Sequence, residues 1–242
     1  MKPIIDFHSH ILPKIDDGSA SVAESIAMLE TEAKHGIRHV VATPHFYPNH
    51  DSPERFLHRR AQSIAALKEA VKDRTDLPKL YYGAEVYFFH GISDSDILSQ
   101  LTIHGTDSIL IEMPHGPWTG AMYRELEAIH DRRGLTPIVA HVDRYIEPFR
   151  TFHIPEKLAE LPVLVQANAE FFTHKFTSRM ALKLLREGKI HLLGSDCHNL
   201  TSRAPNLHGA VSLIHSKLGD EAIEFICRNQ MAAMSSQNYS AI

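Results

Sequence analysis

The chain has 242 residues, of which 43% are hydrophobic and 22% are charged, an ordinary balance for a folded protein of one or two domains. Its 25 Lys and Arg against 29 Asp and Glu give a net charge of −4, so a strongly basic nucleic-acid or membrane binder is not expected. No apolar run approaches the roughly 20 residues of a membrane helix. We therefore expect one domain over residues 1–242 without membrane insertion. Two cysteines offer no disulfide framework, which suits the cytoplasm.

Short apolar runs recur along the chain and alternate with amphipathic stretches. Several runs are rich in Val or Ile and few alternate apolar with polar residues, a pattern typical of strands buried on both faces of a parallel sheet. The seven runs are Ile4–Phe7, His39–Ala42, Leu80–Gly83, Ser108–Ile111, Pro137–Ala140, Val163–Gln166 and His191–Leu193.

The stretches between these runs carry helix start and stop signals. Ser21 and Glu24 form a possible capping box, and Ser52 precedes a proline suited to the first helical position. Glycines provide the expected ends. One predicted helix begins after Ser21 and ends near Gly36, and a second begins at Pro53. Two further helices end near Gly134 and near Gly188. One or two helices fill the tail beyond Asn206.

Strands that alternate with helices pair in parallel through right-handed crossovers. Two architectures fit this pattern, namely an open doubly wound sheet and a closed barrel of about seven strands. Six of the seven runs end in His, Asp or Glu. A barrel gathers side chains from many strand ends at one rim, whereas an open sheet concentrates its site at one switch point. The sequence therefore favours the barrel.

The polar residues at the strand ends are of the types that bind metal ions. His8 and His10 lie two residues apart on a strand, so their side chains point to the same side, and the same spacing relates Asp196 to His198. The two pairs would meet when the first and last strands close a barrel. Imidazole and carboxylate ligands suit Mn, Fe, Zn or Co, for two or three ions. The candidate ligands are His8, His10, His45, Glu85, Glu112, His141, Asp196 and His198.

At these residues the chain resembles the PHP (polymerase and histidinol phosphatase) superfamily. Within it the chain is most similar to the bacterial capsule-type, metal-dependent protein-tyrosine phosphatases. The resemblance covers nearly the whole chain, and its first and last segments are the most specific. The matching segments are DFHSHILPKIDDGS at 6–19, ATPHFYP at 42–48, GAEVYF at 83–88, IEMP at 111–114, AHVDRY at 140–145 and GSDCHNLTSRAP at 194–205.

This resemblance implies a distorted (β/α)7 barrel of the PHP type with its metal site at the carboxyl-terminal rim of the strands. It also implies three divalent ions, with manganese preferred and iron, zinc or cobalt as alternatives. Asp17 joins the ligand set only through the resemblance, and Asp16 is the competing choice. The implied allocation is His8, His10, Glu85 and Asp196 for one ion, Glu85, Glu112 and His141 for a second, and Asp17, His45 and His198 for a third.

The implied reaction is hydrolysis of protein phosphotyrosine. Clustered ions lower the pKa of a bound water and neutralise phosphoryl oxygens, so a bridging hydroxide would attack phosphorus directly. Arg144 and Arg203 match positions that the family uses to hold phosphate, and guanidinium binds phosphate bidentately. A phenolate leaving group needs little acid assistance, so we assign no general acid. The implied partner is a cytoplasmic tyrosine kinase that controls capsule or exopolysaccharide synthesis.

Several alternatives remain open from the sequence. The same ions could serve a small phosphomonoester such as histidinol phosphate, a nucleic-acid 3′–5′ exonuclease, or a non-catalytic regulator. The net charge and the absence of a Lys/Arg stripe argue against nucleic acid. Cys197 and Arg203 also match the C-x5-R spacing of cysteine-dependent phosphatases. That chemistry needs a thiolate surrounded by backbone N–H groups. The loop after Cys197 has no glycine, and Asp196 precedes the cysteine, so neither feature favours a cysteine nucleophile. The sequence leaves the oligomeric state open.

Overall fold

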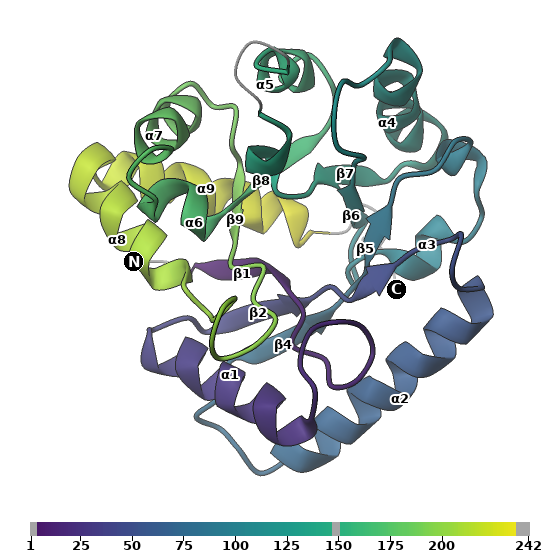
Figure 1. The fold of residues 1–242 in the computed structure, drawn as a ribbon, viewed down its shortest axis with the longest axis vertical. Helices are drawn as coiled ribbons and strands as arrows, with labels where there is room; N and C mark the ends of the chain where they lie inside the picture. Colours follow the sequence, from purple (N-terminus) through teal and green to yellow (C-terminus); the bar gives the residue numbers. More distant parts are fainter. Residues whose placement is uncertain (1–3, 147–150, 236–242) are drawn as a thin grey trace.

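The computed structural model describes residues 4–146 and 151–235. Within these ranges, short strands lie at the centre of the molecule and helices surround them (Figure 1). Every strand pair is parallel. The strands are β1 (Ile5–Ser9), β2 (His39–Ala42), β3 (His45–Phe46), β4 (Lys79–Tyr82), β5 (Glu85–Tyr87), β6 (Ser108–Glu112), β7 (Thr136–Val139), β8 (Leu164–Asn168) and β9 (Leu192–Gly194).

The helices occupy the connections between the strands and the end of the described chain. The longer ones begin and end close to the capping signals in the sequence. They are α1 (Val22–Lys34), α2 (Pro53–Val71), α3 (Leu98–Leu101), α4 (Gly120–Arg133), α5 (Ile154–Leu158), α6 (Ala169–Thr173), α7 (Ser178–Arg186), α8 (Leu207–Leu218) and α9 (Asp220–Ala233), with 3-10 turns η1 (Ile92–Asp94) and η2 (Val142–Tyr145).

The predicted helix caps are present, except that the Glu24 carboxylate accepts from the Ala20 backbone N–H, at 2.8 Å, and not from that of Ser21 as a capping box requires. The Ser21 hydroxyl accepts a hydrogen bond from the backbone N–H of Glu24 at 3.1 Å, and Ser52 caps α2 ahead of Pro53. Gly134 ends α4 with φ +64°, a left-handed conformation that glycine adopts without steric cost.

The parallel sheet curls, so that the first and last strands lie side by side. Hydrogen bonds give the strand orders β1-β2-β4 and β3-β5-β6-β7-β8-β9. A bridge between Ser9 and Cys197 joins the end of β1 to the segment after β9, and the His10 N–H donates to the Cys197 carbonyl at 2.8 Å. The architecture is therefore an α/β fold with a curled parallel sheet, and the flat open sheet is not formed.

Two of the predicted strands are interrupted. The run His39–Ala42 is followed by a separate short strand, β3, and the run at Leu80–Gly83 by another, β5. Pro44 has no N–H to donate to a neighbouring strand. Gly83 lies so close to the next segment that a Cβ there would stand 3.3 Å from the Ile103 side chain. Glu85 consequently begins β5, whereas the sequence placed it after the end of a single strand.

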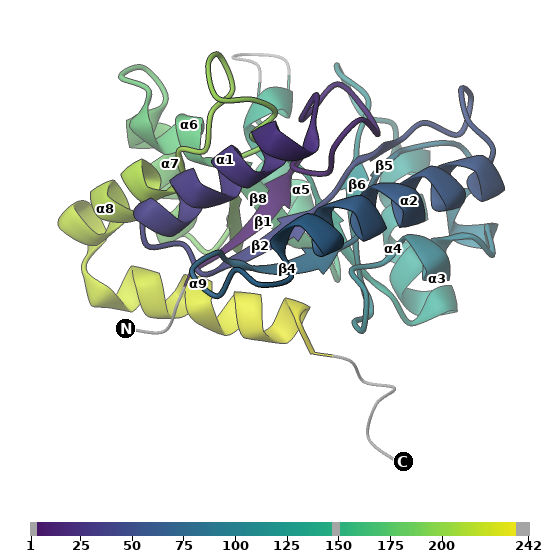
Figure 2. The same ribbon diagram turned by 90° about the horizontal axis from the view of Figure 1, so that it is seen from below.

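The inside of the curled sheet is apolar at one end and polar at the other. Phe7, Val41, Leu110 and Ile138 belong to a buried apolar cluster between the strands, and Ala233 of α9 packs on it. Figure 2 shows α9 across one end of the strands and the loops that follow the strands at the opposite end. Because α9 closes the amino ends of the strands, the open face is the face onto which the carboxyl ends emerge.

No helix within residues 4–146 and 151–235 is both long enough and apolar enough to cross a membrane.

Candidate metal centre

Histidine and acidic side chains from seven places in the sequence gather where the strands end. All of them except Asp17 are buried or nearly so. His8 belongs to β1, His45 begins β3, Glu85 begins β5, Glu112 ends β6, His141 follows β7, Asp196 and His198 follow β9, and His10 and Asp17 lie in the loop after β1.

The first group of potential ligands joins the two ends of the chain. His8 Nε2 lies 3.1 Å from His10 Nε2, and both nitrogens lie 3.1–3.2 Å from Glu85 Oε2. Asp196 Oδ1 is 3.5 Å from His8 Nε2 and 3.4 Å from His10 Nε2. Two ligands that share one ion at bond lengths of about 2.1 Å stand about 3.0–3.4 Å apart. The four side chains therefore have the spacing of one coordination shell.

A second group is centred on the other oxygen of Glu85. His141 Nε2 lies 2.8 Å from Glu85 Oε1 and 3.9 Å from Glu112 Oε1. The first oxygen, Glu85 Oε2, which faces His8 and His10, also lies 2.9 Å from His45 Nδ1. One buried carboxylate thus faces both groups, an arrangement suited to a bridging ligand.

A third group lies toward the solvent. Asp17 Oδ1 is 3.6 Å from His45 Nε2 and 3.5 Å from His198 Nε2. His10 joins these residues in a set whose ligand atoms all lie within 4.8 Å of one another. The structure therefore brings together each of the candidate ligands named from the sequence and the resemblance.

The donor atoms fit metal ions better than they fit one another. His8 and His10 each direct Nδ1 at an oxygen, of Gln166 at 3.2 Å and of Asp16 at 2.8 Å. With the Nδ1 atoms turned toward these oxygens, both Nε2 atoms, 3.1 Å apart, face the same space, where one cation could accept a lone pair from each. Glu85 Oε2, Glu112 Oε2 and His198 Nε2 are buried without a hydrogen-bond partner among the described residues.

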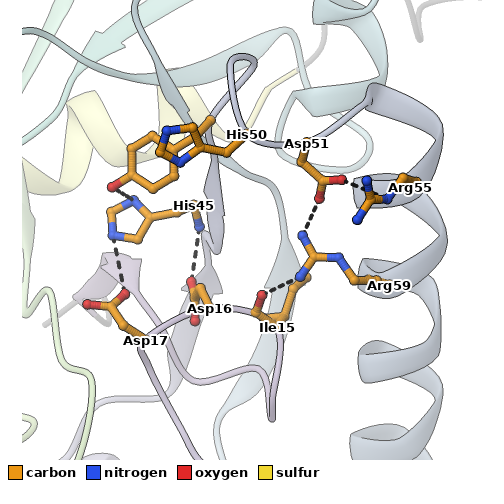
Figure 3. A pocket seen from close by; sticks show the side chains of 9 residues that line it. Ile15, Asp16, Asp17, His45, His50, Asp51, Arg55 and Arg59 are labelled. Atoms are coloured by element: carbon orange, nitrogen blue, oxygen red, sulfur yellow. Dashed lines mark hydrogen bonds and ion pairs between the residues drawn. The ribbon is translucent and has the colours of Figure 1, made fainter.

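Asp16 and Asp17 take different positions. Asp17 points toward His45 and His198, as Figure 3 shows for His45. Asp16 lies behind the ligands, where its carboxylate accepts hydrogen bonds from His10 Nδ1 and, at 3.0 Å, from the His45 backbone N–H. Asp16 is thus placed to orient imidazoles and Asp17 to offer a ligand oxygen.

Replacing Asp16 with asparagine is expected to weaken Mn²⁺ binding by about tenfold, the lower end of the range for partners that orient metal ligands. The amide keeps the size of the side chain but loses the charge that fixes the His10 tautomer. Titration of metal-stripped protein with Mn²⁺ measures the change. Unaltered affinity would show that Asp16 does not act on the metal centre.

Three further supporting residues escaped the sequence analysis. Gln166 Oε1 accepts from the His141 backbone N–H at 2.7 Å as well as from His8, and the Asn168 side-chain amide donates to Asp196 at 3.1 Å. Asp6 accepts from the His8 and Ser195 backbone N–H groups at 3.1 and 2.9 Å. Gln166 and Asn168 lie on β8, the one predicted strand without His, Asp or Glu at its end. The amide side chains of this strand were the only sequence feature that could have pointed to these two residues.

Asp196 and His198 do converge, but not through an extended strand. Asp196 has φ +53°, a left-handed conformation that is uncommon outside glycine. The turn directs Asp196 and His198 into the ligand cluster and leaves Cys197 facing the other way, fully buried beside Asp6 and Glu32. Burial, together with the charges of Asp6 and Glu32, raises the pKa of the Cys197 thiol well above its usual range.

Two arginines border the cluster. A guanidinium nitrogen of Arg144 contacts Asp196 Oδ2, and Arg203 Nη2 lies 2.8 Å from the same oxygen. Both side chains are about one-third exposed. Two positive charges thus share one carboxylate that also faces two histidines, and Arg203 Nη1 lies 4.0 Å from Asp17 Oδ2 as well.

Burial and charge set the protonation of the residues at this edge. Burial, with the nearby charges of His10 and Arg203, lowers the pKa of His198 to about 4. Burial alone would raise the pKa of Asp196, but His8 and His10 hold it well below its usual range. At neutral pH His198 is therefore a neutral imidazole and Asp196 a carboxylate, the forms in which these groups bind cations.

Fold and site together define a class: parallel α/β proteins whose strand ends carry a dense set of potential metal ligands. Within this class the chain belongs to the CpsB/CapC family of capsular polysaccharide synthesis, whose family model matches residues 4–235. This confirms the resemblance inferred from the sequence motifs.

Relatives of known name match over most of their length. The tyrosine-protein phosphatase CpsB of Streptococcus pneumoniae is 29% identical over 237 residues, which cover 89% of this chain and 91% of the relative. The tyrosine-protein phosphatase YwqE of Bacillus subtilis is 28% identical over 247 residues, covering 97% and 92%.

Solved structures share the fold. Structures described as YwqE from Bacillus subtilis and CpsB from Streptococcus pneumoniae, metal-dependent tyrosine phosphatases, give a match with a TM-score of 0.81 at 21% identity, covering 96% of this chain and 94% of the solved one. The phosphotriesterase homology protein of Escherichia coli, with phosphate in its active site, gives 0.57 at 13% identity, covering 95% and 98%.

Proposed function

We propose that the chain is a metal-dependent protein-tyrosine phosphatase. The observation that carries this proposal is the juxtaposition of the ligand cluster with Arg144 and Arg203, which meet at Asp196. The tyrosine-protein phosphatase names of the relatives support the substrate class.

The (β/α)7 barrel expected from the sequence is part of this proposal. In this interpretation β2 with β3 and β4 with β5 are two interrupted strands, so that the nine strands within the described residues form seven. The bridge from Ser9 to Cys197 supports closure between the first and the seventh strand. We propose one domain over residues 1–242, of which residues 1–3, 147–150 and 236–242 lie outside the described part.

We further propose three divalent ions, with manganese preferred and iron, zinc or cobalt as alternatives. The three groups described above would hold them, with Glu85 shared between two. Histidine nitrogens and carboxylate oxygens without a thiolate suit these metals. Bound there, such ions would activate water and neutralise phosphoryl oxygens.

The chain's own contribution to catalysis is orientation and charge. Arg144 and Arg203 are placed to hold two phosphoryl oxygens, and each guanidinium can do so bidentately. Asp196 keeps both arginines turned toward the cluster, while Gln166 and Asp16 fix the histidine tautomers. A tyrosine leaves as a phenolate of pKa about 10, so its departure needs little proton donation from the protein.

The proposed protein substrate is a phosphotyrosine-bearing tyrosine kinase that controls capsule or exopolysaccharide synthesis in the cytoplasm. Membership of a capsular polysaccharide synthesis family supports the pathway. The phosphotyrosine of such a kinase supplies the aryl phosphate that the reaction requires.

A panel of substrates tests the proposal. Protein loaded with Mn²⁺ is given phosphotyrosine and phosphoserine peptides of one sequence, histidinol phosphate and a single-stranded oligonucleotide. We expect the highest kcat/KM for the phosphotyrosine peptide. A higher value for histidinol phosphate, or nucleotide release from the oligonucleotide, would replace the proposed substrate by one of these alternatives.

Replacing Cys197 with serine is expected to leave kcat/KM within about twofold of the native value. The thiol faces away from the ligand cluster, and burial keeps it protonated because it raises its pKa. Steady-state kinetics with the phosphotyrosine peptide, alongside a check that the metal content is unchanged, make the measurement. A loss of activity at full metal content would instead indicate a cysteine nucleophile.

A further inference from the structure

A pocket of about 590 Å³ opens beside the candidate metal centre. Asp17 and His45 of the ligand cluster line one side of it (Figure 3). Asp51, which precedes α2, and Arg55 and Arg59 of α2 line the opposite side. A group that left the metal centre through this pocket would therefore pass between the ligand cluster and α2.

The carboxylates that line this pocket are already engaged. Asp16 accepts hydrogen bonds from His10 and from the His45 backbone, and Asp17 faces His45 and His198. Asp51 is only one-tenth exposed and pairs with both arginines. Asp16 and Asp51 are thus engaged by partners within the protein, whereas Asp17, whose side chain is 66% exposed, keeps its carboxylate at the ligand side of the pocket.

The two arginines differ in how much of their hydrogen-bonding capacity is used. Arg59 donates to the Ile15 carbonyl at 2.6 Å and to Asp51, so it ties α2 to the loop that carries Asp16. Arg55 approaches Asp51 only through Nε, at 3.4 Å, and its side chain is 75% exposed. Among the described residues its terminal nitrogens have no carboxylate partner, so the outer end of the Arg55 guanidinium is free to accept an acidic group from outside the protein.

Aromatic side chains form the part of the pocket nearest the ligands. The Tyr47 ring lies 4.9 Å from the His45 ring and 5.9 Å from the His50 ring, measured between centroids. Tyr47 and His50 both line the pocket. An aromatic ring next to the metal centre can pack against these rings at the usual spacing.

We propose that this pocket is a substrate subsite in which the phosphotyrosine ring packs against Tyr47 and His50 and an acidic side chain of the substrate, near the phosphotyrosine, pairs with Arg55. The inference rests on the proposed phosphatase function and adds the substrate's charge to it. A phosphotyrosine peptide with Glu at the position whose carboxylate reaches Arg55 is then hydrolysed faster than the same peptide with Gln there.

The test compares phosphotyrosine peptides that carry Glu, Gln or Lys at each position from three before to three after the phosphotyrosine. The quantity measured is the ratio of kcat/KM for the Glu peptide to that for the Gln peptide. We expect a ratio of about five at the preferred position, the upper range for an exposed ion pair. Arg55→Ala should reduce it to about one, and Arg55→Glu should favour the Lys peptide instead.

Arg132→Glu is the matched control. Arg132 is also a largely exposed helical arginine with an acidic partner, Asp94, but it lies at the end of α4 that leads into β7, opposite the ligand cluster. Its variant should keep the native ratio. A native ratio of one at every position, or a ratio that Arg55→Ala and Arg55→Glu leave unchanged, would overturn the subsite. Failure to hydrolyse any phosphotyrosine peptide would overturn the proposed function itself.

Discussion

Replacing Glu85 with glutamine is expected to lower kcat/KM for phosphotyrosine peptides by about 10³-fold, or about 4 kcal/mol. Glu85 is the carboxylate that faces two of the three ligand groups, with one oxygen near His8 and His10 and the other near His141. The amide keeps the size of the side chain but removes the charge that would balance two ions. The bound metal, measured by elemental analysis, should fall in parallel.

Glu69→Gln is the matched control, because Glu69 is a glutamate on α2 whose side chain is 74% exposed and pairs only with Lys72 among the described residues. It should retain native activity and metal content. A Glu85→Gln protein with a full complement of metal and near-native kcat/KM would show that the cluster is not the catalytic centre.

Replacing Arg144 with alanine is expected to reduce kcat/KM by about 10²–10³-fold while the metal content stays unchanged. This magnitude is typical for the loss of one donor that stabilises charge in a transition state. Arg144 contacts Asp196 at the border of the cluster, where it can reach a phosphoryl oxygen without itself being a metal ligand.

Arg144→Lys separates charge from geometry. Lysine keeps the positive charge but loses the bidentate fork, so we expect its activity to lie between those of the native and alanine proteins. Arg132→Ala, on the outer surface of α4, should have no effect. Loss of metal together with activity in Arg144→Ala would contradict the phosphate-holding role and indicate that Arg144 supports the ligands instead.

Much of the site could be predicted because strand periodicity and strand ends are local properties of the sequence. The spacing of His8 and His10 predicts that both imidazoles point to one side, and the structure has their Nε2 atoms 3.1 Å apart, although β1 ends at Ser9 and His10 lies just beyond it. The carboxyl ends of parallel strands meet on one face. Residues as distant in sequence as His8 and Asp196 are therefore brought together by the fold alone.

Other features depend on contacts that a single sequence does not display. Asp16 and Asp17 are chemically identical neighbours, and only the path of the loop turns Asp16 toward His10 and Asp17 toward His45. Asp196 reaches the cluster through a positive φ angle, which a sequence normally indicates by a glycine and which this position, being Asp, does not indicate. Gln166 supports two histidines from a strand that showed no metal-binding residue type.

The interrupted strands were missed for a related reason. Pro44 and Gly83 were read as parts of strand ends, although one lacks an N–H and the other packs against Ile103. Their effect is to begin new short strands at His45 and Glu85, so that these candidate ligands lie in paired strands rather than in free loops. Such pairing gives a firmer position than the sequence analysis assumed.

The most direct test of the account is phosphate release from a phosphotyrosine peptide by metal-stripped protein, before and after Mn²⁺ is added. We expect no release without metal and turnover after its addition, with native activity recovered as the ligand cluster fills. Equal release in both conditions would contradict a metal-dependent centre at the strand ends. If no phosphate is released in either condition, although the protein binds the added Mn²⁺, phosphotyrosine would be contradicted as the substrate.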